Sequence, residues 1–247
     1  METKETSELL RNLAKQYNTK DFIQNDPVQF PHRYTDKRDI EISALISSWM
    51  AYGNRKQIIL TLNQLHAEFY DSPYLYIRSR RYVPHRNNEQ CLYRFYTYKD
   101  FYQLCNTLYY IYIRNQYPSL EDKLLSMQKE YTSCLSLLRA IISLFPDQNG
   151  IPQNTTSACK RLCLFLRWLI RKDSIVDFGI WNLLPQSELL IPLDTHVFRM
   201  AKELNLTTRK QADMKTAEEI SNKLKEVFPD DPTLGDFALF GYGIGHK

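Results

Sequence analysis

The sequence predicts an all-helical protein, and three observations support that class. Apolar residues recur at the three- and four-residue spacing of amphipathic helices over most of the 247 residues. No segment shows the sustained alternation of apolar and polar residues that is typical of a half-buried strand. The chain also contains only 7 glycines, few for a sandwich or barrel that needs many tight turns.

The first third of the chain is expected to contain one short helix and then a pair of longer helices. Residues 5–17 place leucines on one side of a helix, and the proline-containing residues 21–36 are expected to form an ordered loop. A strong helix follows over residues 39–52. Gly53 is expected to end it as a left-handed cap, and Asn54 can then cap the next helix.

Residues 70–98 are less regular and hold a basic, tyrosine-rich segment. From Arg78 to Lys99 there are six basic residues and a single acid, Glu89, with aromatic residues among them. Such a segment suits phosphates and stacked bases. It equally suits a solvated loop whose arginines cover aromatic rings.

The remaining chain is expected to form further helices separated by a clear break at residues 146–152, which contain glycine and proline. Helices are expected over residues 99–116, 119–129, 131–145, 157–172 and 195–204, over a segment that starts with a capping box at 216–219 and ends near 228, and over 234–240.

Composition indicates a globular protein with no targeting or membrane-spanning segment. Apolar residues make up 43% and charged residues 24% of the chain, whose net charge is +4. The N-terminus carries acids and no apolar stretch, and no apolar run reaches membrane-spanning length. We therefore expect a cytoplasmic protein, associated with the bacterial nucleoid, without a membrane partner. The five cysteines lack CxxC spacing, which favours free thiols over disulfides or a metal site.

The helix expected over residues 157–172 carries the first candidate catalytic residue. At about 100° per residue, Lys160, Arg167 and Arg171 fall within about 20° of one another on a mostly apolar helix. This stripe either faces water or places Lys160 at the inner end of a cleft. In the cleft, burial and neighbouring cations would lower the pKa of Lys160 from about 10.4 and supply the neutral amine that a nucleophile requires.

Asp194 is the second candidate, because it begins a helix directly after a Pro–Leu pair. An aspartate in this position is commonly a capping residue worth about 1 kcal/mol. The helix dipole also keeps such a carboxylate ionised. Beside a cleft, an ionised carboxylate can stabilise a developing oxocarbenium ion or accept a proton from an attacking amine or water. Capping and catalysis therefore both remain open for Asp194.

The residues around Asp194 resemble a signature of DNA repair enzymes. Residues 193–199 read LDTHVFR, which is similar to the VDTHVxR signature of the endonuclease III-like helix-hairpin-helix glycosylases. Weaker similarity extends over residues 38–245. The resemblance implies a two-lobed helical fold in which Asp194 is catalytic. It also implies that Lys160, on the helix after the hairpin, attacks C1′ of the damaged nucleotide and forms a Schiff base. The long separation of the two residues is closer to that in the archaeal 8-oxoguanine glycosylases.

Two features distinguish this chain from endonuclease III. No glycine stands between Gly150 and Lys160, so the hairpin that normally offers backbone N–H groups to phosphate is degenerate. The expected replacements are the side chains of Asn154, Thr155, Thr156 and Ser157. No cysteine follows Cys163, so the four-cysteine iron–sulfur site is missing, and neither a cofactor nor a metal is expected.

The chain as a whole also resembles a bacterial family known only as a domain of unknown function. That likeness includes residues 26–34 (DPVQFPHRY) and residues 167–173 (RWLIRKD). It implies no particular activity.

Together these features predict a base-excision enzyme that flips a damaged base out of double-stranded DNA. A helical barrel is expected over residues 38–190, with residues 1–37 and 191–247 in a second lobe and the catalytic pair in the cleft between them. The residues expected to orient the pair or to contact phosphate are Arg167, Arg171, His196 and Arg199. No obligate protein partner is indicated.

Two other functions remain open. A non-catalytic nucleic-acid-binding protein on the same scaffold would keep its phosphate affinity after Lys160→Ala and would release no base. A helical protein-interaction module would show no salt-dependent binding to DNA at all.

Overall fold

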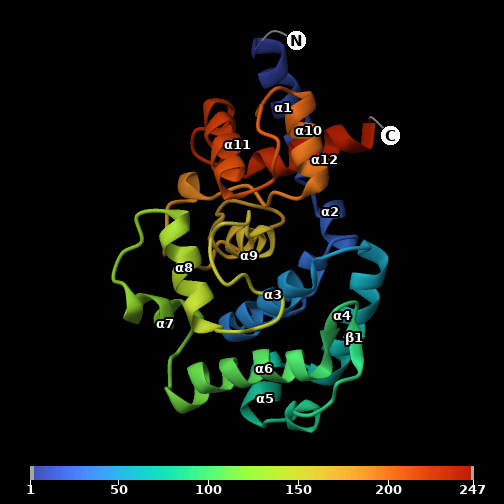
Figure 1. Cartoon of the computed structure of the whole chain (residues 1–247), viewed down its shortest axis with the longest axis vertical. Coiled ribbons are helices and arrows are strands. Elements are labelled where there is room, and N and C mark those ends of the chain that lie inside the picture. Colours follow the sequence, from blue (N-terminus) through green and yellow to red (C-terminus); the bar gives the residue numbers. More distant parts are fainter. Residues whose placement is uncertain (1–2, 246–247) are drawn as a thin grey trace. The chain divides into compact units, whose positions relative to one another are not determined.

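The structure is a computed structural model that describes residues 3–245, which are mainly α-helical (Figure 1). The prediction of an all-α class is confirmed at this level. In the described part of the chain, the strands are the short β1 (Cys91–Tyr93) and β2 (Tyr96–Thr97), which pair antiparallel as a hairpin. Within the same residues, each helix is too short or too polar to span a membrane.

The described residues divide into two compact units. One contains residues 3–24, 131–138 and 154–245, and the other contains residues 25–130 and 139–153. The sequence placed the boundaries at residues 38 and 190 instead. The difference lies mainly in residues 154–190, which group with the chain ends because arginines in this segment bind aspartates that come later in the chain.

The unit that begins at residue 25 contains the long helices α3 (Lys37–Met50) and α4 (Arg55–Phe69). Every residue of α3 from Asp39 to Met50 is buried. Polar groups on such a helix must find partners inside the protein. Glu41 does so, because its carboxylate accepts hydrogen bonds from the Tyr112 hydroxyl at 2.7 Å and the Leu120 backbone N–H at 2.8 Å.

The turn between α3 and α4 follows the sequence prediction in part. The Asn54 side chain caps α4 by accepting a hydrogen bond from the Gln57 N–H. Gly53 has the predicted left-handed backbone, with φ at +98°. It lies in the turn beyond α3 rather than at its cap, since the helix already ends at Met50.

The other elements of this unit are shorter. They are the single turns η1 (Pro27–Gln29), η2 (Pro31–Arg33) and η3 (Val83–His85), the helices α5 (Pro73–Arg78), α6 (Tyr98–Tyr109) and α7 (Leu120–Met127), the π-helical turn η4 (Tyr110–Arg114), and residues 139–144 of α8 (Cys134–Leu144).

The unit that contains the chain ends is also helical. Its elements are α1 (Thr3–Tyr17), α2 (Lys20–Gln24), the first residues of α8, α9 (Lys160–Ile170), the turn η5 (Gln186–Glu188), α10 (Thr195–Glu203), α11 (Met214–Val227) and α12 (Leu234–Gly245). Helices α1 and α12 pack closely, with the Tyr17 ring against Gly241 and the Phe240 ring.

Several helix ends differ from the prediction, among them those of α9, α11 and α12. Helix α9 begins at Lys160 rather than at 157, because Cys159 has a left-handed backbone with φ at +47°. Helix α11 is capped by Asp213 instead of Thr216, which lies inside the helix and donates to the Asp213 carboxylate. Helix α12 continues beyond Phe240 through three glycines to Gly245.

Candidate active site

Lys160 and Asp194 lie next to each other in the structure. Lys160 is the first residue of α9, Asp194 is the N-cap of α10, and the Lys160 Nζ is 3.5 Å from Asp194 Oδ2. Both belong to the same compact unit, so the pair does not depend on a cleft between two lobes. The side chains are 32% and 38% exposed. Lys160 is therefore only partly buried, and the pair can be reached by a ligand from solvent.

The two carboxylate oxygens of Asp194 have different partners. Oδ1 accepts hydrogen bonds from the backbone N–H groups of His196 and Val197, each at 2.9 Å. These bonds satisfy donors at the start of α10 that have no partner within the helix. Oδ2 faces the Lys160 amine. Capping and a chemical role are therefore compatible in Asp194, because they use separate oxygens.

The loop before α9 is attached to a neighbouring helix. Its residues Asn154 and Thr156 bond to each other, with the Asn154 Oδ1 accepting from the Thr156 N–H at 3.0 Å. Thr156 O accepts from the Met214 N–H at 3.2 Å, and Ser157 forms an isolated bridge with Asp213. The loop is thus attached to the start of α11.

The four residues expected to replace the glycine hairpin are accessible to different degrees. Asn154, Thr156 and Ser157 are exposed, and Thr155 is half-buried. They directly precede Lys160 in the chain. Part of their hydrogen-bonding capacity is already used inside the loop, since the Thr156 hydroxyl also donates to Asn154. Phosphate binding by these side chains stays a prediction.

Arg167 and Arg171 are buried, which corrects the expectation that they contact phosphate. Their side chains are 1% and 3% exposed. Arg171 donates to the Asp177 carboxylate at 2.8 Å and to the Asp231 carboxylate at 2.5 Å. Apart from Lys160, the basic stripe therefore faces the interior of the unit. Its two arginines are bound there by carboxylates and face neither water nor a ligand.

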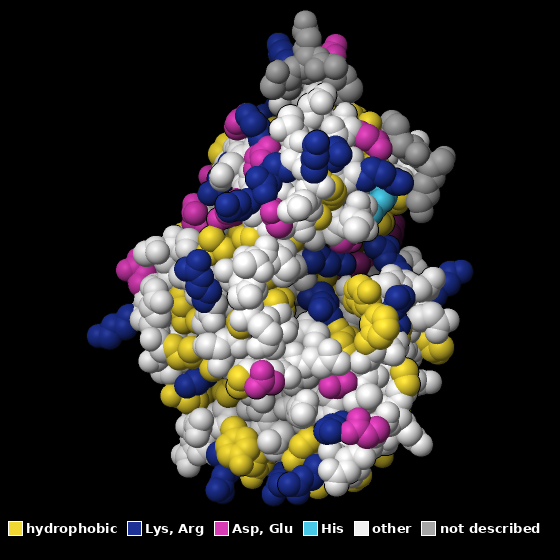
Figure 2. Space-filling model, in the orientation of Figure 1, with side chains coloured by type: hydrophobic (Ala, Val, Ile, Leu, Met, Phe, Trp, Pro, Cys, Tyr) yellow, Lys and Arg dark blue, Asp and Glu magenta, His cyan; other side chains and the backbone are white. Residues whose placement is uncertain are grey.

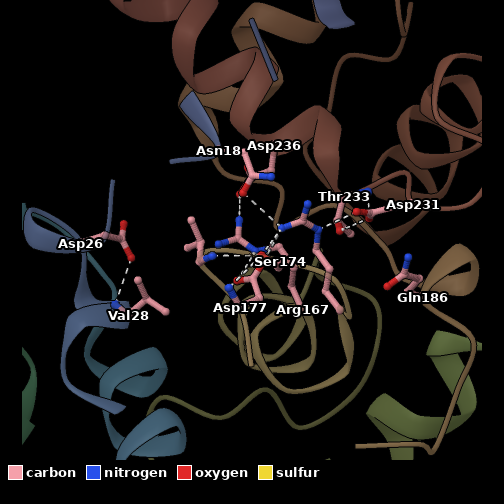
Figure 3. A network of polar contacts seen from close by, with 12 residues as sticks. Asn18, Asp26, Val28, Arg167, Ser174, Asp177, Gln186, Asp231, Thr233 and Asp236 are labelled. Atoms are coloured by element: carbon pink, nitrogen blue, oxygen red, sulfur yellow. Dashed lines mark hydrogen bonds and ion pairs between the residues drawn. The ribbon is translucent and has the colours of Figure 1, made fainter. Parts of the chain in front are cut away.

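The arginines belong to a larger polar network (Figure 3). Arg167 contacts the Asp177 carboxylate at 3.3 Å and also binds Asp236. Both guanidinium groups lie over the ring of Phe237, at 4.7 and 5.2 Å from its centroid. Additional hydrogen bonds join Arg171 to Asn18 and Ser174. The network thus connects α9 to Asn18, which lies between α1 and α2, and to Asp236 in the first turn of α12.

The sequence contains a signal that could have predicted this network. Arg167 and Arg171 are one helical turn apart on a helix that is otherwise apolar around its circumference. Charges on a helix buried on all sides require partners of opposite charge. The pattern therefore predicts carboxylates elsewhere in the chain, although not which ones.

His196 and Arg199, the other two expected contacts, lie on α10 near Asp194. The His196 ring packs against α12, where a Cβ on Gly243 would come within 2.2 Å of its Nε2. Arg199 is exposed, with its Nε 3.9 Å from a Glu203 carboxylate oxygen one turn further along the helix. The His196 side chain is therefore fixed by packing against α12, whereas the Arg199 side chain is accessible to solvent.

The thiols of this unit pack without forming disulfides. Cys134, Cys159 and Cys163 are buried. A hydrogen bond with Cys134 and burial raise the pKa of the Cys163 thiol, and burial raises that of Cys159. Among residues 3–245, no group of three His, Cys, Asp or Glu side chains is arranged to hold a metal ion.

Comparison with known proteins gives one match. Residues 26–245 match the family described as "Protein of unknown function (DUF2400)". The chain belongs to this family. The matched region includes both Lys160 and Asp194, and it begins with the DPVQFPHRY segment at residues 26–34. No curated protein and no solved structure matches the chain.

Proposed function

We propose that this protein is a DNA glycosylase of the helix-hairpin-helix superfamily that excises a damaged base through a Schiff base on Lys160. The observation that carries the proposal is the 3.5 Å contact between the Lys160 amine and the Asp194 carboxylate, which is open to solvent. The all-helical fold and the LDTHVFR segment at residues 193–199 support it. The loop before α9 would then be the degenerate hairpin.

The chemistry assigns one role to each residue. The Lys160 amine forms a bond to C1′ while the bond from C1′ to the base breaks, and its electron pair leaves with the base, which is then protonated. Asp194 accepts the proton that the lysine ammonium must lose before attack and then passes it to the departing base. The attached nitrogen then loses one proton, its lone pair expels O4′, which takes up a proton as the sugar ring opens, and an iminium remains between Lys160 and C1′.

The proposal is tested by trapping the iminium with borohydride. Wild-type protein is incubated with duplex DNA that carries an abasic site, 8-oxoguanine or uracil, and the covalent adduct is measured on a denaturing gel. We expect an adduct that Lys160→Ala abolishes. Lys172→Ala is the matched control, because Lys172 follows the same helix and its amine bonds to Asn182 instead of Asp194.

The outcomes separate the functions that the sequence left open. An adduct that survives Lys160→Ala would assign the Schiff base to another amine. The absence of an adduct on every substrate would exclude the lyase mechanism. Base release without an adduct would then indicate hydrolysis by water, and DNA binding without base release would indicate a non-catalytic binding protein.

A further inference from the structure

The turn of the β1–β2 hairpin presents an exposed aromatic ring. Tyr93 pairs with Tyr96, so Arg94 and Phe95 form a two-residue turn. The Phe95 residue is 72% exposed. Arg94 has φ at +53°, in the left-handed region that favours glycine at such a turn. The left-handed backbone of Arg94 costs stability and the exposed Phe95 ring adds little to it, so the turn is a candidate for a binding role.

A second exposed ring lies beside this turn. The Arg94 guanidinium is 4.9 Å from the ring centroid of Tyr52 and 5.8 Å from that of Phe95. Tyr52 is 45% exposed. The Arg94 side chain runs against Gly53, where a Cβ would come within 2.7 Å of its Nη1. We call Tyr52, Arg94 and Phe95 the hairpin surface.

Hydrogen bonds and packing hold the hairpin surface in a defined position. The Tyr93 hydroxyl donates to the Tyr52 carbonyl at 2.6 Å, and the Asn149 side chain donates to the Phe95 carbonyl at 3.0 Å. Beneath the turn, the ring of Tyr96 stacks on Trp49 with centroids 4.3 Å apart. A surface anchored in this way loses little conformational entropy when it binds a ligand.

Charged side chains of both signs lie around the hairpin surface, and the cation in contact with its rings is Arg94. The first turn of α4, directly after Gly53, holds Arg55 and Lys56 and no acid. Two acids lie nearby. Asp26 is paired with Arg55 at 3.9 Å, and Asp100 accepts a hydrogen bond at 3.2 Å from the Asn149 side chain that also binds the Phe95 carbonyl. On the face shown in Figure 2, basic side chains are scattered among acidic ones instead of forming one patch. The positive charge that the hairpin surface offers to a ligand is therefore that of the exposed Arg94.

We infer that the hairpin surface stacks against an unpaired nucleobase of DNA, with the Arg94 guanidinium binding the adjacent phosphate. Flat exposed rings and a fixed cation are the combination that binds single strands without strong sequence preference. An unpaired base is required, because bases within a duplex already stack on their neighbours. This inference rests on the proposed function in assuming that the protein binds DNA, but it does not depend on the chemistry of Lys160.

The test measures binding of the full-length protein to two DNA probes by fluorescence anisotropy. One probe is single-stranded, and the other is a perfectly paired duplex of the same sequence. Phe95→Leu removes the π-system but keeps an apolar side chain, whereas Phe95→Trp keeps a stacking ring. We expect Phe95→Leu to weaken single-strand binding by about 5- to 150-fold, the range for loss of one stacked base. We expect Phe95→Trp to bind like wild type.

A matched pair of arginine variants distinguishes binding at the hairpin surface from a general effect of positive charge on DNA affinity. Arg94→Gly and Arg80→Gly each remove one exposed arginine that has positive φ and lies over a tyrosine ring, Tyr52 or Tyr109. Both changes relieve backbone strain, so both variants should fold at least as stably as wild type. We expect only Arg94→Gly to weaken single-strand binding strongly.

The outcomes distinguish this inference from the proposed function. If wild type binds the single-stranded probe and Phe95→Leu binds it equally well, the inference is wrong. The hairpin surface would then not stack on a nucleobase. Equal losses from Arg94→Gly and Arg80→Gly would also overturn it, because charge alone would then account for binding. If wild type does not bind the single-stranded probe, the inference fails, whereas the proposed function is decided separately by the trapping assay on damaged duplex.

Discussion

At the residue scale, Asp194 combines structure and chemistry in one carboxylate. Oδ1 satisfies two backbone donors of α10, and Oδ2 faces the Lys160 amine. An asparagine at this position keeps an oxygen for the cap but has no negative charge. An alanine has neither. The two substitutions therefore separate the contribution of Asp194 to folding from its contribution to the proposed reaction.

We expect Asp194→Asn to leave the free energy of unfolding within a few tenths of a kcal/mol of wild type, because asparagine is as good an N-cap as aspartate. We expect Asp194→Ala to lower that free energy by about 1 kcal/mol. Both variants should lose the borohydride-trapped adduct. Urea unfolding and the trapping assay measure the two effects. An adduct of normal yield from Asp194→Asn would show that the negative charge has no chemical role.

At the scale of elements, Arg167 of α9 and Arg171 at its C-cap bind α9 to segments that follow it in the chain. Arg171 is held between two carboxylates, both from buried aspartates. Removing one partner of a buried ion pair leaves a charge without compensation, which costs far more than the loss of a surface pair.

We therefore expect Arg171→Met to lower the free energy of unfolding by about 3–5 kcal/mol. Arg199→Met is the control on the neighbouring helix α10, since its exposed arginine faces Glu203 one turn away. That change should cost at most about 0.5 kcal/mol. Urea unfolding at low and high salt gives both values. If the two variants were equally stable, the α9 network would have no special role in folding.

The contact between α10 and α12 predicts that Gly243→Ala changes from destabilising to stabilising when the His196 ring is removed. Gly243→Ala would place a Cβ within 2.2 Å of the His196 ring, so we expect it to destabilise the wild-type protein. In a His196→Ala background the ring is gone, and the higher helix propensity of alanine should make the same change stabilising by up to about 1 kcal/mol. A double-mutant cycle from urea unfolding measures the coupling. Additive effects would mean that His196 is not seated on Gly243.

At the scale of the whole molecule, a buried histidine links stability to pH. Burial lowers the pKa of His66 from 6.5 to about 3, and its ring bonds to the Ser43 hydroxyl at 2.8 Å. The unfolded chain takes up a proton near pH 6.5 that the folded chain excludes until about pH 3. The free energy of unfolding should therefore fall as the pH drops through this window, by up to about 1.4 kcal/mol per pH unit.

Replacing both partners isolates this contribution. Ser43→Ala with His66→Phe removes the buried hydrogen bond from both sides, so neither partner is left unsatisfied. We expect the double variant to lose stability less steeply than wild type between pH 6.5 and pH 3. Urea unfolding at several pH values gives the slopes. Identical slopes would mean that His66 is not responsible for the acid sensitivity.

The sequence predicted the parts of this fold that depend on local signals. Asn54 and Asp194 were identified as caps because a capping side chain acts within its own turn. Lys160 and Asp194 were each identified as candidates from their own segments, but only the resemblance to a known signature paired them. The hairpin was missed because strands of three and two residues are too short to show alternation.

Other features depend on residues that are far apart in the chain. Asp236, which binds Arg167, lies 69 residues after it, and nothing in either local segment identifies the other. The left-handed backbone of Cys159 was likewise not predictable, because cysteine has no preference for that conformation. The start of α9, and with it the helical position of Lys160, is therefore set by packing and not by local sequence.

The distribution of the thiols has a practical consequence. Cys91, in β1 next to the Arg94–Phe95 turn, is exposed, whereas the other four cysteines are buried. A maleimide fluorophore should thus attach to the native protein at a single position, without any engineered cysteine. The dye would sit beside the turn and report directly on what approaches it. Counting the labels per chain by mass spectrometry would also distinguish folded from unfolded protein. The folded chain should carry one label and the unfolded chain five.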